Sequence, residues 1–369
     1  MRHRSWELAC SLLAIPAIVC AVWNPELVRM ALGAFGSEPG VVLRRWLLVA
    51  LLFTLVALWR RRAVRTSGRS QWLSALVVLA MAAMGVTLMR DRGLRTRNVT
   101  FRGNDITLAG TMFVPDAKGP FPAVVLVHGS PPLKRGFYAV WAERLAREGF
   151  VVLVADKRGV GGTGGTFNNQ NNGSRANLTL LAGDVTAAVE YLALQAEVDS
   201  ARVGLIGVSQ AGWVAPLAAS MSPRIRYIAL VTAPAVSVFE EQVWSELRGD
   251  DQRSTTTSRA AAEKIMDTVN SRGFNPRPLL GALNIPGVWM FGDDDNSIPT
   301  QKSVAVLDSL RLHADKDYAS YRFPRAGHAL ITRSAGVMPR IQPTSWEPLI
   351  AWLQVHGKSP RGANTAKRL

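Results

Sequence analysis

Between residues 123 and 323 the chain carries six short runs typical of β-strands, separated by stretches with helical character. The first five runs are largely apolar, as parallel strands are when both faces of their sheet are covered. Alternation of such strands with helices predicts an α/β fold, with a mostly parallel sheet and helices on both faces. The runs are AVVLVH (123–128), FVVLVA (150–155), RVGLIGV (202–208), YIALVT (227–232), GVWMFG (287–292) and YASYRF (318–323).

Further elements extend this plan on both sides. The segments 98–103 and 106–115 are expected to pair as an antiparallel hairpin that turns at Gly103, Asn104 and Asp105. The interval 233–286 has mixed helical character and is too long for a simple connection, so we expect an insertion that is functional or mobile. Helices are expected at 138–148, 178–195, 211–221, 300–312 and 346–356.

Three apolar stretches precede the folded part, and each approaches the roughly 20 residues that a helix needs to cross a bilayer. Tryptophans lie at or near their edges, where the indole ring prefers the membrane interface. We therefore expect residues 1–97 to form a membrane region with transmembrane helices at 6–23, 41–59 and 72–89. The first stretch contains Glu7 and Pro16, so two spans are the alternative to three.

The charge distribution favours the same interpretation. Residues 1–97 hold 14 Arg, no Lys and four acidic residues, which gives this segment +10 of the chain's net +16. Arginines that flank membrane spans account for this better than nucleic-acid binding, because the folded part shows no basic helix face. We expect a multi-pass protein of a bacterial inner membrane, with the lipid bilayer as a partner and no nucleic acid. The arginines divide equally between the two sides, so the side that the folded domain faces stays open.

A glycine-rich loop follows the second apolar run, and Gly159 to Gly164 has the G-x-G-x-x-G spacing of dinucleotide sites. Such a site needs the glycines to open a helix whose N-terminus meets the pyrophosphate. Here they continue into the polar run GTFNNQNNGS (165–174), which has no helical character. The sequence therefore predicts a loop and no nucleotide site. No two histidines have metal-ligand spacing, so no metal is expected.

The segment GLIGVSQAGW (204–213) places Ser209 directly between an apolar strand and a helical stretch. Gly207 and Ala211 lie two residues before and after the serine, and only small residues fit around so tight a turn. This pattern indicates a nucleophile elbow, which exposes the hydroxyl at the carboxyl edge of the sheet. An aspartate-rich segment and then His328 follow along the chain, in the order nucleophile, acid and base.

With the segments VLVHGS, ADKRGVGGT, GVSQAG, FGDDDNSIP and GHAL, residues 98–357 resemble an α/β-hydrolase, similar to bacterial carboxylesterases and prolyl-oligopeptidase-like enzymes. The resemblance implies that Ser209 is the nucleophile, His328 the general base and Asp295 the residue that orients the imidazole. Asp295 is chosen because it fits the spacing G-x-x-D-x-x-x-P with Gly292 and Pro299.

The resemblance also implies the surroundings of the triad. The oxyanion hole would be formed by the backbone N–H groups of Gln210 and Ser130, with Gly129 as the reserve for the second donor. Asp156 and Arg158 in the glycine loop would have structural roles. The insertion 233–286 would be a helical cap, and members of the superfamily typically need no cofactor.

The expected function is that of a membrane-anchored serine hydrolase that cleaves a carboxylic ester of a small molecule through an acyl-enzyme. A peptidase or thioesterase with the same triad is an alternative, as is a non-catalytic hydrolase-like binding module. Phe239, Val243, Trp244 and Leu247 form an apolar face at helical spacing, which fits either an acyl pocket or core packing. The basic tail 358–369 is expected to be disordered, and the oligomeric state is left open.

Overall fold

The computed structural model describes residues 93–249, 257–328, 330–332, 340–341 and 346–358. Their strands are β1 (Leu94–Arg102), β2 (Thr107–Pro115), β3 (Phe121–Val127), β4 (Val151–Ala155), β5 (Val198–Val208), β6 (Ile225–Val231), β7 (Gly287–Gly292), β8 (Tyr318–Phe323), β9 (Ile331–Thr332) and β10 (Arg340–Ile341). Eight of them form one sheet in the order β1-β2-β4-β3-β5-β6-β7-β8, and β9 and β10 form a small ribbon. In the large sheet the β1–β2 and β2–β4 pairs are antiparallel and the other pairs are parallel. This confirms the predicted α/β-hydrolase fold with a mostly parallel sheet.

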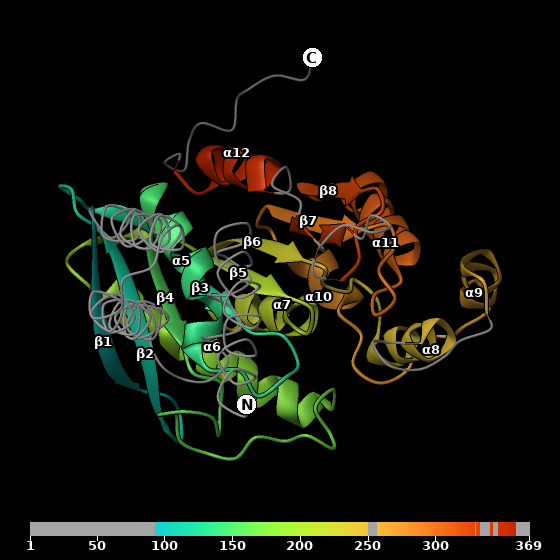
Figure 1. The fold of residues 1–369 in the computed structure, drawn as a ribbon, viewed down its shortest axis with the longest axis horizontal. Coiled ribbons are helices and arrows are strands. Elements are labelled where there is room, and N and C mark those ends of the chain that lie inside the picture. Colours follow the sequence, from blue (N-terminus) through green and yellow to red (C-terminus); the bar gives the residue numbers. More distant parts are fainter. Residues whose placement is uncertain (1–92, 250–256, 329, 333–339, 342–345, 359–369) are drawn as a thin grey trace, which may run out of the picture.

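Helices cover both faces of this sheet (Figure 1). The helical elements are η1 (Arg135–Tyr138), α5 (Ala139–Arg147), α6 (Arg175–Ala193), α7 (Ala211–Met221), α8 (Val238–Arg248), α9 (Arg259–Met266), α10 (Arg277–Ala282), α11 (Thr300–His313) and α12 (Trp346–His356). Helices α6, α7, α10 and α11 contribute to the core on one face, and α5 and α12 contribute to the core on the other. The predicted helices at 211–221 and 346–356 agree with α7 and α12 at both ends.

Alternation along the central strands explains why these strands are apolar throughout. On β3, Val125 and Val127 face the α6 and α7 side, whereas Val124 and Leu126 face the α5 and α12 side. Successive side chains of a strand point to opposite faces, so a strand covered on both faces needs an apolar residue at every position. The hairpin also forms as predicted, but β1 begins at Leu94, four residues before the expected start of the domain at Asn98.

The insertion 233–286 is helical, but only part of it stands apart from the main body. Helices α8 and α9 lie at one end of the molecule and share a small core of Trp244, Ala262 and Met266 (Figure 1). Helix α10 instead places Leu280 in the main core. The apolar face predicted on α8 is accounted for by packing, because Trp244 is buried and its neighbours Val243 and Leu247 pack against the same cluster.

The three predicted membrane spans, 6–23, 41–59 and 72–89, lie outside the described residues, as does the tail beyond Lys358. Within the described ranges no helix combines the length and the apolarity that a membrane crossing requires.

Candidate active site

Ser209 occupies a strained turn between β5 and α7. Its φ angle is 54°, a left-handed conformation that residues other than glycine rarely adopt. The turn is so tight that a Cβ on Gly207 would lie 2.3 Å from the Cβ of Ala211, which explains the small residues on either side. The Ser209 N–H donates to the carbonyl of Val231 at the end of β6, and this bond of 3.1 Å fixes the turn against the sheet. The structure thus forms the elbow that the sequence predicts.

Asp295 and His328 meet at the carboxyl ends of β7 and β8. Nδ1 of His328 lies 3.0 Å from Oδ2 and 3.2 Å from Oδ1 of Asp295, whose carboxylate is completely buried. Oδ1 of Asp295 also accepts hydrogen bonds from the backbone N–H groups of Ser297 at 2.8 Å and Ile298 at 2.9 Å. Three hydrogen-bond donors therefore hold this carboxylate, and it in turn holds the imidazole by Nδ1.

The two neighbouring aspartates make hydrogen bonds to other residues. Asp293 pairs with Arg322 at 2.7 Å, and the backbone N–H of Asp294 donates to the carbonyl of Ala326 at 2.8 Å. These contacts tie the β7 loop to the β8 loop and leave Asp295 as the carboxylate that faces His328. Because β5, β7 and β8 run in parallel, Ser209 lies at the same edge of the sheet as this pair.

The loop after β3 lies beside the serine. A Cβ on Gly129 would be 3.5 Å from the Cβ of Ser209, so the backbone of this loop passes next to that serine. The Gly129 N–H donates to the hydroxyl of Tyr138 at 3.4 Å, which favours the N–H of Ser130 over that of Gly129 as the predicted second oxyanion donor. Gln210, whose N–H is the first predicted donor, is buried at the N-cap of α7.

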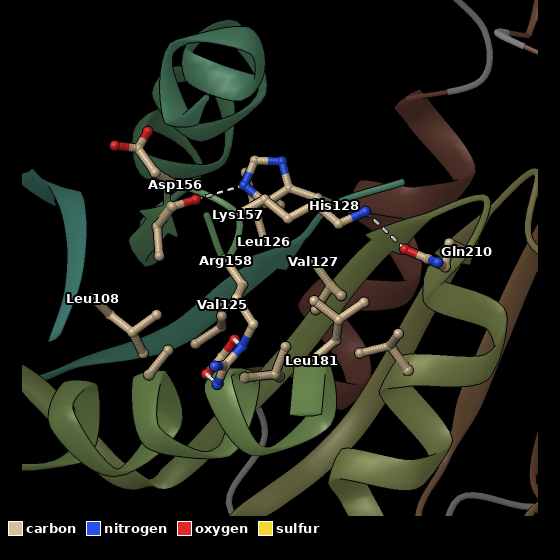
Figure 2. A pocket seen from close by; sticks show the side chains of 15 residues that line it. Leu108, Val125, Leu126, Val127, His128, Asp156, Lys157, Arg158, Leu181 and Gln210 are labelled. Atoms are coloured by element: carbon tan, nitrogen blue, oxygen red, sulfur yellow. Dashed lines mark hydrogen bonds and ion pairs between the residues drawn. The ribbon is translucent and has the colours of Figure 1, made fainter. Parts of the chain in front are cut away.

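Lys157 was missed by the sequence analysis, although its ammonium is hydrogen-bonded to both of these loops. It donates to the carbonyl oxygens of Gly129 at 2.6 Å and Ser130 at 2.8 Å, and to Oε1 of Gln210 at 2.8 Å. Figure 2 shows its Nζ directed at the Gln210 side chain, with His128 alongside. In the sequence Lys157 stands between Asp156 and Arg158, two residues for which the resemblance implies structural roles, and nothing in that position marks the lysine itself as functional.

Asn172, from the polar run after the glycines, joins the same two loops. Its Nδ2 donates to the carbonyl of Ser130 at 2.9 Å, and its Oδ1 accepts from Nε2 of Gln210 at 2.8 Å. Asn177 supports it by donating to its carbonyl at 2.8 Å. The asparagine-rich run therefore holds two loops of the site together, a structural role that its composition did not predict.

The pocket beside these residues is too small for a substrate. It holds about 50 Å³ between β3, the end of β4, and helices α6 and α7 (Figure 2). Ligand sites commonly enclose several hundred Å³, so this space admits a few water molecules at most. His128 at its edge bonds through Nε2 to the carbonyl of Ala155, and burial lowers the pKa of His128 to about 4. His128 is therefore neutral, and its hydrogen bond to Ala155 shapes the loop.

The glycine loop has the structural role that the sequence predicted. Asp156 accepts hydrogen bonds from the backbone N–H groups of Arg135 at 2.7 Å and Gly162 at 2.9 Å. Arg158 bonds to Asp184 and, through two nitrogens, to Asp105. Helix α6 begins only at Arg175, so the glycines open no helix and the geometry of a dinucleotide site is not formed.

The cap contacts the segment that carries Asp295. Trp244 of α8 donates its indole N–H to the backbone carbonyl of Asp295 at 3.3 Å, and Arg259 of α9 donates to the same oxygen at 3.2 Å. The guanidinium of Arg259 also lies over the Trp244 ring, 5.4 Å from its centre. The position of the cap is thereby coupled to the position of the acid.

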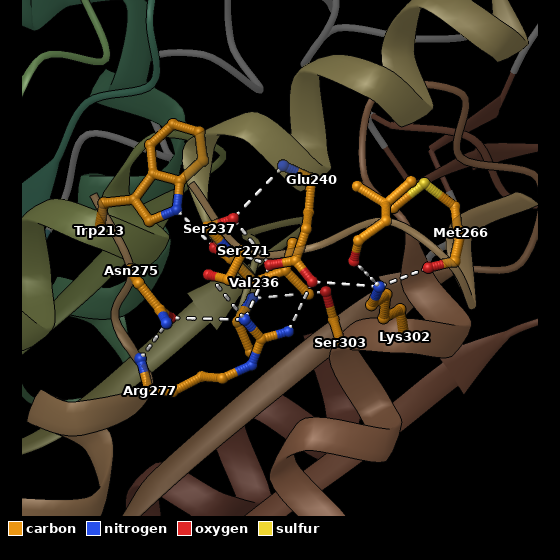
Figure 3. A network of polar contacts seen from close by, with 12 residues as sticks. Trp213, Val236, Ser237, Glu240, Met266, Ser271, Asn275, Arg277, Lys302 and Ser303 are labelled. Atoms are coloured by element: carbon orange, nitrogen blue, oxygen red, sulfur yellow. Dashed lines mark hydrogen bonds and ion pairs between the residues drawn. The ribbon is translucent and has the colours of Figure 1, made fainter. Parts of the chain in front are cut away.

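A buried charge network anchors the cap to the main body (Figure 3). Glu240 of α8 is 1% exposed, and its two carboxylate oxygens bond to the guanidinium of Arg277 at 2.7 and 2.8 Å. Lys302 of α11 lies 3.1 Å from the same carboxylate, and Ser237 forms a capping box with it. Burial by itself would raise the pKa of Glu240, but hydrogen bonds from Arg277 and Ser237 outweigh burial and lower that pKa to about 2.

We expect Glu240→Gln to lower the free energy of unfolding at pH 7 by about 3 kcal/mol, since the pKa difference between folded and unfolded states is a stability term. The folded-state pKa is depressed, so this stabilisation is complete above the ordinary pKa of 4.5 and is lost as the pH falls toward 2. Urea unfolding of the full chain at pH 7 and pH 3 measures it, with Glu246→Gln on the exposed side of α8 as the control. If Glu240→Gln lowered the free energy of unfolding by the same amount at both pH values, the depressed pKa of Glu240 would not be the source of the stabilisation.

Among the described residues no cluster of three or more His, Cys, Asp or Glu side chains has the arrangement of a metal site.

A family model described as the prolyl oligopeptidase family matches residues 138–358, more than half of the chain. An uncharacterised protein of Pseudomonas aeruginosa is 26% identical over 174 residues, which cover 46% of this chain and 46% of that protein. The chain thus spans less than half the length of this curated relative.

Two solved structures share the fold. The acylaminoacyl peptidase of Pyrococcus horikoshii aligns with a TM-score of 0.59 at 18% identity, over 74% of this chain and 44% of that one. The Pyrococcus furiosus esterase Pf2001 aligns with a TM-score of 0.53 at 17% identity, over 72% of this chain and 94% of that one. At these identities the likeness shows the architecture and leaves the substrate undetermined.

Proposed function

The chain belongs to the prolyl oligopeptidase family, and on that premise we propose that it is a hydrolase that cleaves acyl substrates through a serine acyl-enzyme. Ser209 is the nucleophile, His328 the general base and acid, and Asp295 the carboxylate that fixes the imidazole. The observation that carries the proposal is the contact of 3.0 Å between the buried carboxylate of Asp295 and Nδ1 of His328, at the sheet edge where the strained Ser209 lies.

In the proposed mechanism the Ser209 oxygen bonds to the acyl carbon while its proton passes to Nε2 of His328. Asp295, at Nδ1, stabilises the imidazolium that forms. The imidazolium then protonates the leaving group, and the carbon–leaving-group bond breaks. Water repeats the sequence on the acyl-enzyme and releases the acid. The N–H groups of Gln210 and Ser130 bind the oxyanion, and each such donor contributes about 3 kcal/mol in typical cases.

A non-catalytic binding module is disfavoured by two features of the site. The left-handed backbone of Ser209 costs about 1–3 kcal/mol, and such strain persists where it serves a function. The completely buried Asp295 carboxylate has the cost of its burial offset by His328 and two backbone donors. A scaffold would need neither arrangement.

For the substrate we propose a carboxylic ester of a small molecule, with a peptide as the second candidate because the family model is that of a peptidase. A thioester would use the same residues. We further propose that the apolar segments 6–23, 41–59 and 72–89 anchor the enzyme in a membrane, since each has the length and flanking tryptophans of a span.

The proposal is tested on the full chain in detergent or lipid vesicles with three acyl substrates. These are a series of p-nitrophenyl esters, an aminoacyl p-nitroanilide and an acyl thioester. We expect a burst of about one equivalent of nitrophenol per protein from the esters, since an acyl-enzyme accumulates when deacylation is slow. Faster turnover of the anilide would favour the peptidase. Folded protein that hydrolyses none of them and does not react with a fluorophosphonate would exclude the proposed mechanism.

A further inference from the structure

Lys157 is a buried cation whose hydrogen bonds all go to uncharged oxygens. Its side chain is 5% exposed, and its three acceptors are two backbone carbonyls and the Gln210 amide. Within the described part of the chain no carboxylate pairs with its ammonium, whereas the adjacent Arg158 has two. Burying a charge without a counter-ion is costly, so the arrangement calls for a compensating role.

The first contact of Lys157 determines the direction of an oxyanion donor. The carbonyl of Gly129 and the N–H of Ser130 belong to the same peptide group, which is planar and trans. In such a group the two point in opposite directions. When Lys157 holds the Gly129 oxygen at 2.6 Å, the Ser130 N–H must point away from the lysine. A rotated peptide would turn that N–H out of the site and leave the ammonium without this acceptor.

The third contact acts on the other donor. Lys157 holds Oε1 of Gln210 at 2.8 Å, while Asn172 accepts from Nε2 of the same amide. The Gln210 side chain is thus fixed at both ends, and it belongs to the residue whose backbone N–H is the first oxyanion donor. One ammonium therefore connects two loops that come from β3 and β5.

We propose that Lys157 is a positioning residue that holds the two oxyanion donors at their working separation, and that only its protonated form does so. The inference rests on the proposed function, since it assigns these N–H groups to the oxyanion. Lys157 touches no reacting atom in this scheme and acts through Gly129, Ser130 and Gln210.

The hydrogen-bond count explains the dependence on protonation. An ammonium has three N–H donors and meets three acceptors here, whereas a neutral amine has two donors and a lone pair that repels a carbonyl oxygen. Burial lowers the pKa of Lys157 to about 7. The titratable groups around it are His128 at the end of β3, Tyr138 beside Gly129, and Asp156 and Arg158 on its own loop. The charged form prevails below that pKa, so turnover should decline on the alkaline side.

The first experiment compares Lys157→Met with Lys118→Met, which removes an exposed lysine remote from the site. We expect Lys157→Met to lower kcat for a p-nitrophenyl ester by about 10- to 100-fold with KM changed less than about 3-fold, because the oxyanion forms only after binding. Lys118→Met should match the wild type. If the wild type turns over esters and Lys157→Met does so equally well, the inference fails while the proposed function stands. If the wild type is itself inert, the proposed function fails.

The second experiment is the pH profile of kcat from pH 5.5 to 9.5, which a merely structural lysine would not shape. The wild type should lose activity above about pH 7, and the residual activity of Lys157→Met should lack that alkaline decline. Lys157→Arg, which keeps its charge throughout, should lack it as well. Should neither variant fold, the wild-type profile decides alone, since a kcat that is constant from pH 7 to 9.5 would overturn the proposal.

Discussion

Ser209→Ala is expected to reduce ester hydrolysis by about 10⁵-fold or more and to abolish fluorophosphonate labelling, because no other group can form the acyl bond once the hydroxyl is removed. The remaining rate would come from the oxyanion donors of Gln210 and Ser130 and from substrate binding. The measurements are steady-state turnover and covalent labelling of the full chain, each compared with the wild type at the same pH.

Ser220→Ala is the matched control, since it makes the same chemical change on the exposed side of α7 and should keep full activity. Ser209→Gly should be as inactive as Ser209→Ala but more stable than it by about 1 kcal/mol, because glycine adopts a φ of 54° without the penalty of a Cβ. Persistent labelling of Ser209→Ala would show that another residue is the nucleophile. Equal stability of the two variants would show that the turn carries no strain.

Much of the fold follows from the sequence because the central strands are buried on both faces. A short continuous apolar run such as GVWMFG is typical of a strand whose two faces are both covered by helices, and it forms β7 with the predicted ends. The sequence predicts the ends of a strand at the edge of the sheet less accurately. β1 begins at Leu94, within a stretch rich in arginine, because pairing with β2 fixes its backbone where apolar patterning does not.

The tight turn around Ser209 and the order of the residues along the chain are local or sequential properties, and the roles of Ser209, Asp295 and His328 follow from the resemblance to α/β-hydrolases. The structure brings two of these residues, Asp295 and His328, into contact. Lys157 and Asn172 could not be found in the same way. Their contacts join loops that follow different strands, and neither the spacing nor the composition of the glycine loop indicates what lies across from it.

The insertion shows a second limit of sequence reasoning. Helical spacing of apolar residues on α8 fits burial against any apolar partner, whether protein or ligand. The structure supplies the protein partner, since Trp244 packs with Ala262 and Met266 of α9. Its indole N–H also donates to the backbone carbonyl of Asp295, so the residue at the core of the cap helps to hold the Asp295 loop. A pattern of one helix cannot show such a contact with a loop about 50 positions away.

Asp295→Asn is expected to lower kcat by about 10⁴-fold with little change in KM or in stability, and the reason lies in how the carboxylate is held. The backbone N–H groups of Ser297 and Ile298 both donate to Oδ1, so an asparagine must place its amide oxygen there. Its NH₂ group then faces Nδ1 of His328. Two donors cannot meet, so the imidazole must carry its proton on Nε2, where it can no longer accept the proton of Ser209.

Asp293→Asn and Asp294→Asn are matched controls, because they make the same change two positions and one position earlier in the same loop. Both should retain kcat within a few-fold, since Asp293 pairs with Arg322 and the Asp294 backbone bonds to Ala326. Stopped-flow measurement of the ester burst separates loss of acylation from misfolding, which circular dichroism of each variant monitors. If Asp294→Asn lost the burst and Asp295→Asn kept it, the acid would be Asp294, and the loop would have to rearrange before catalysis to bring that carboxylate to His328.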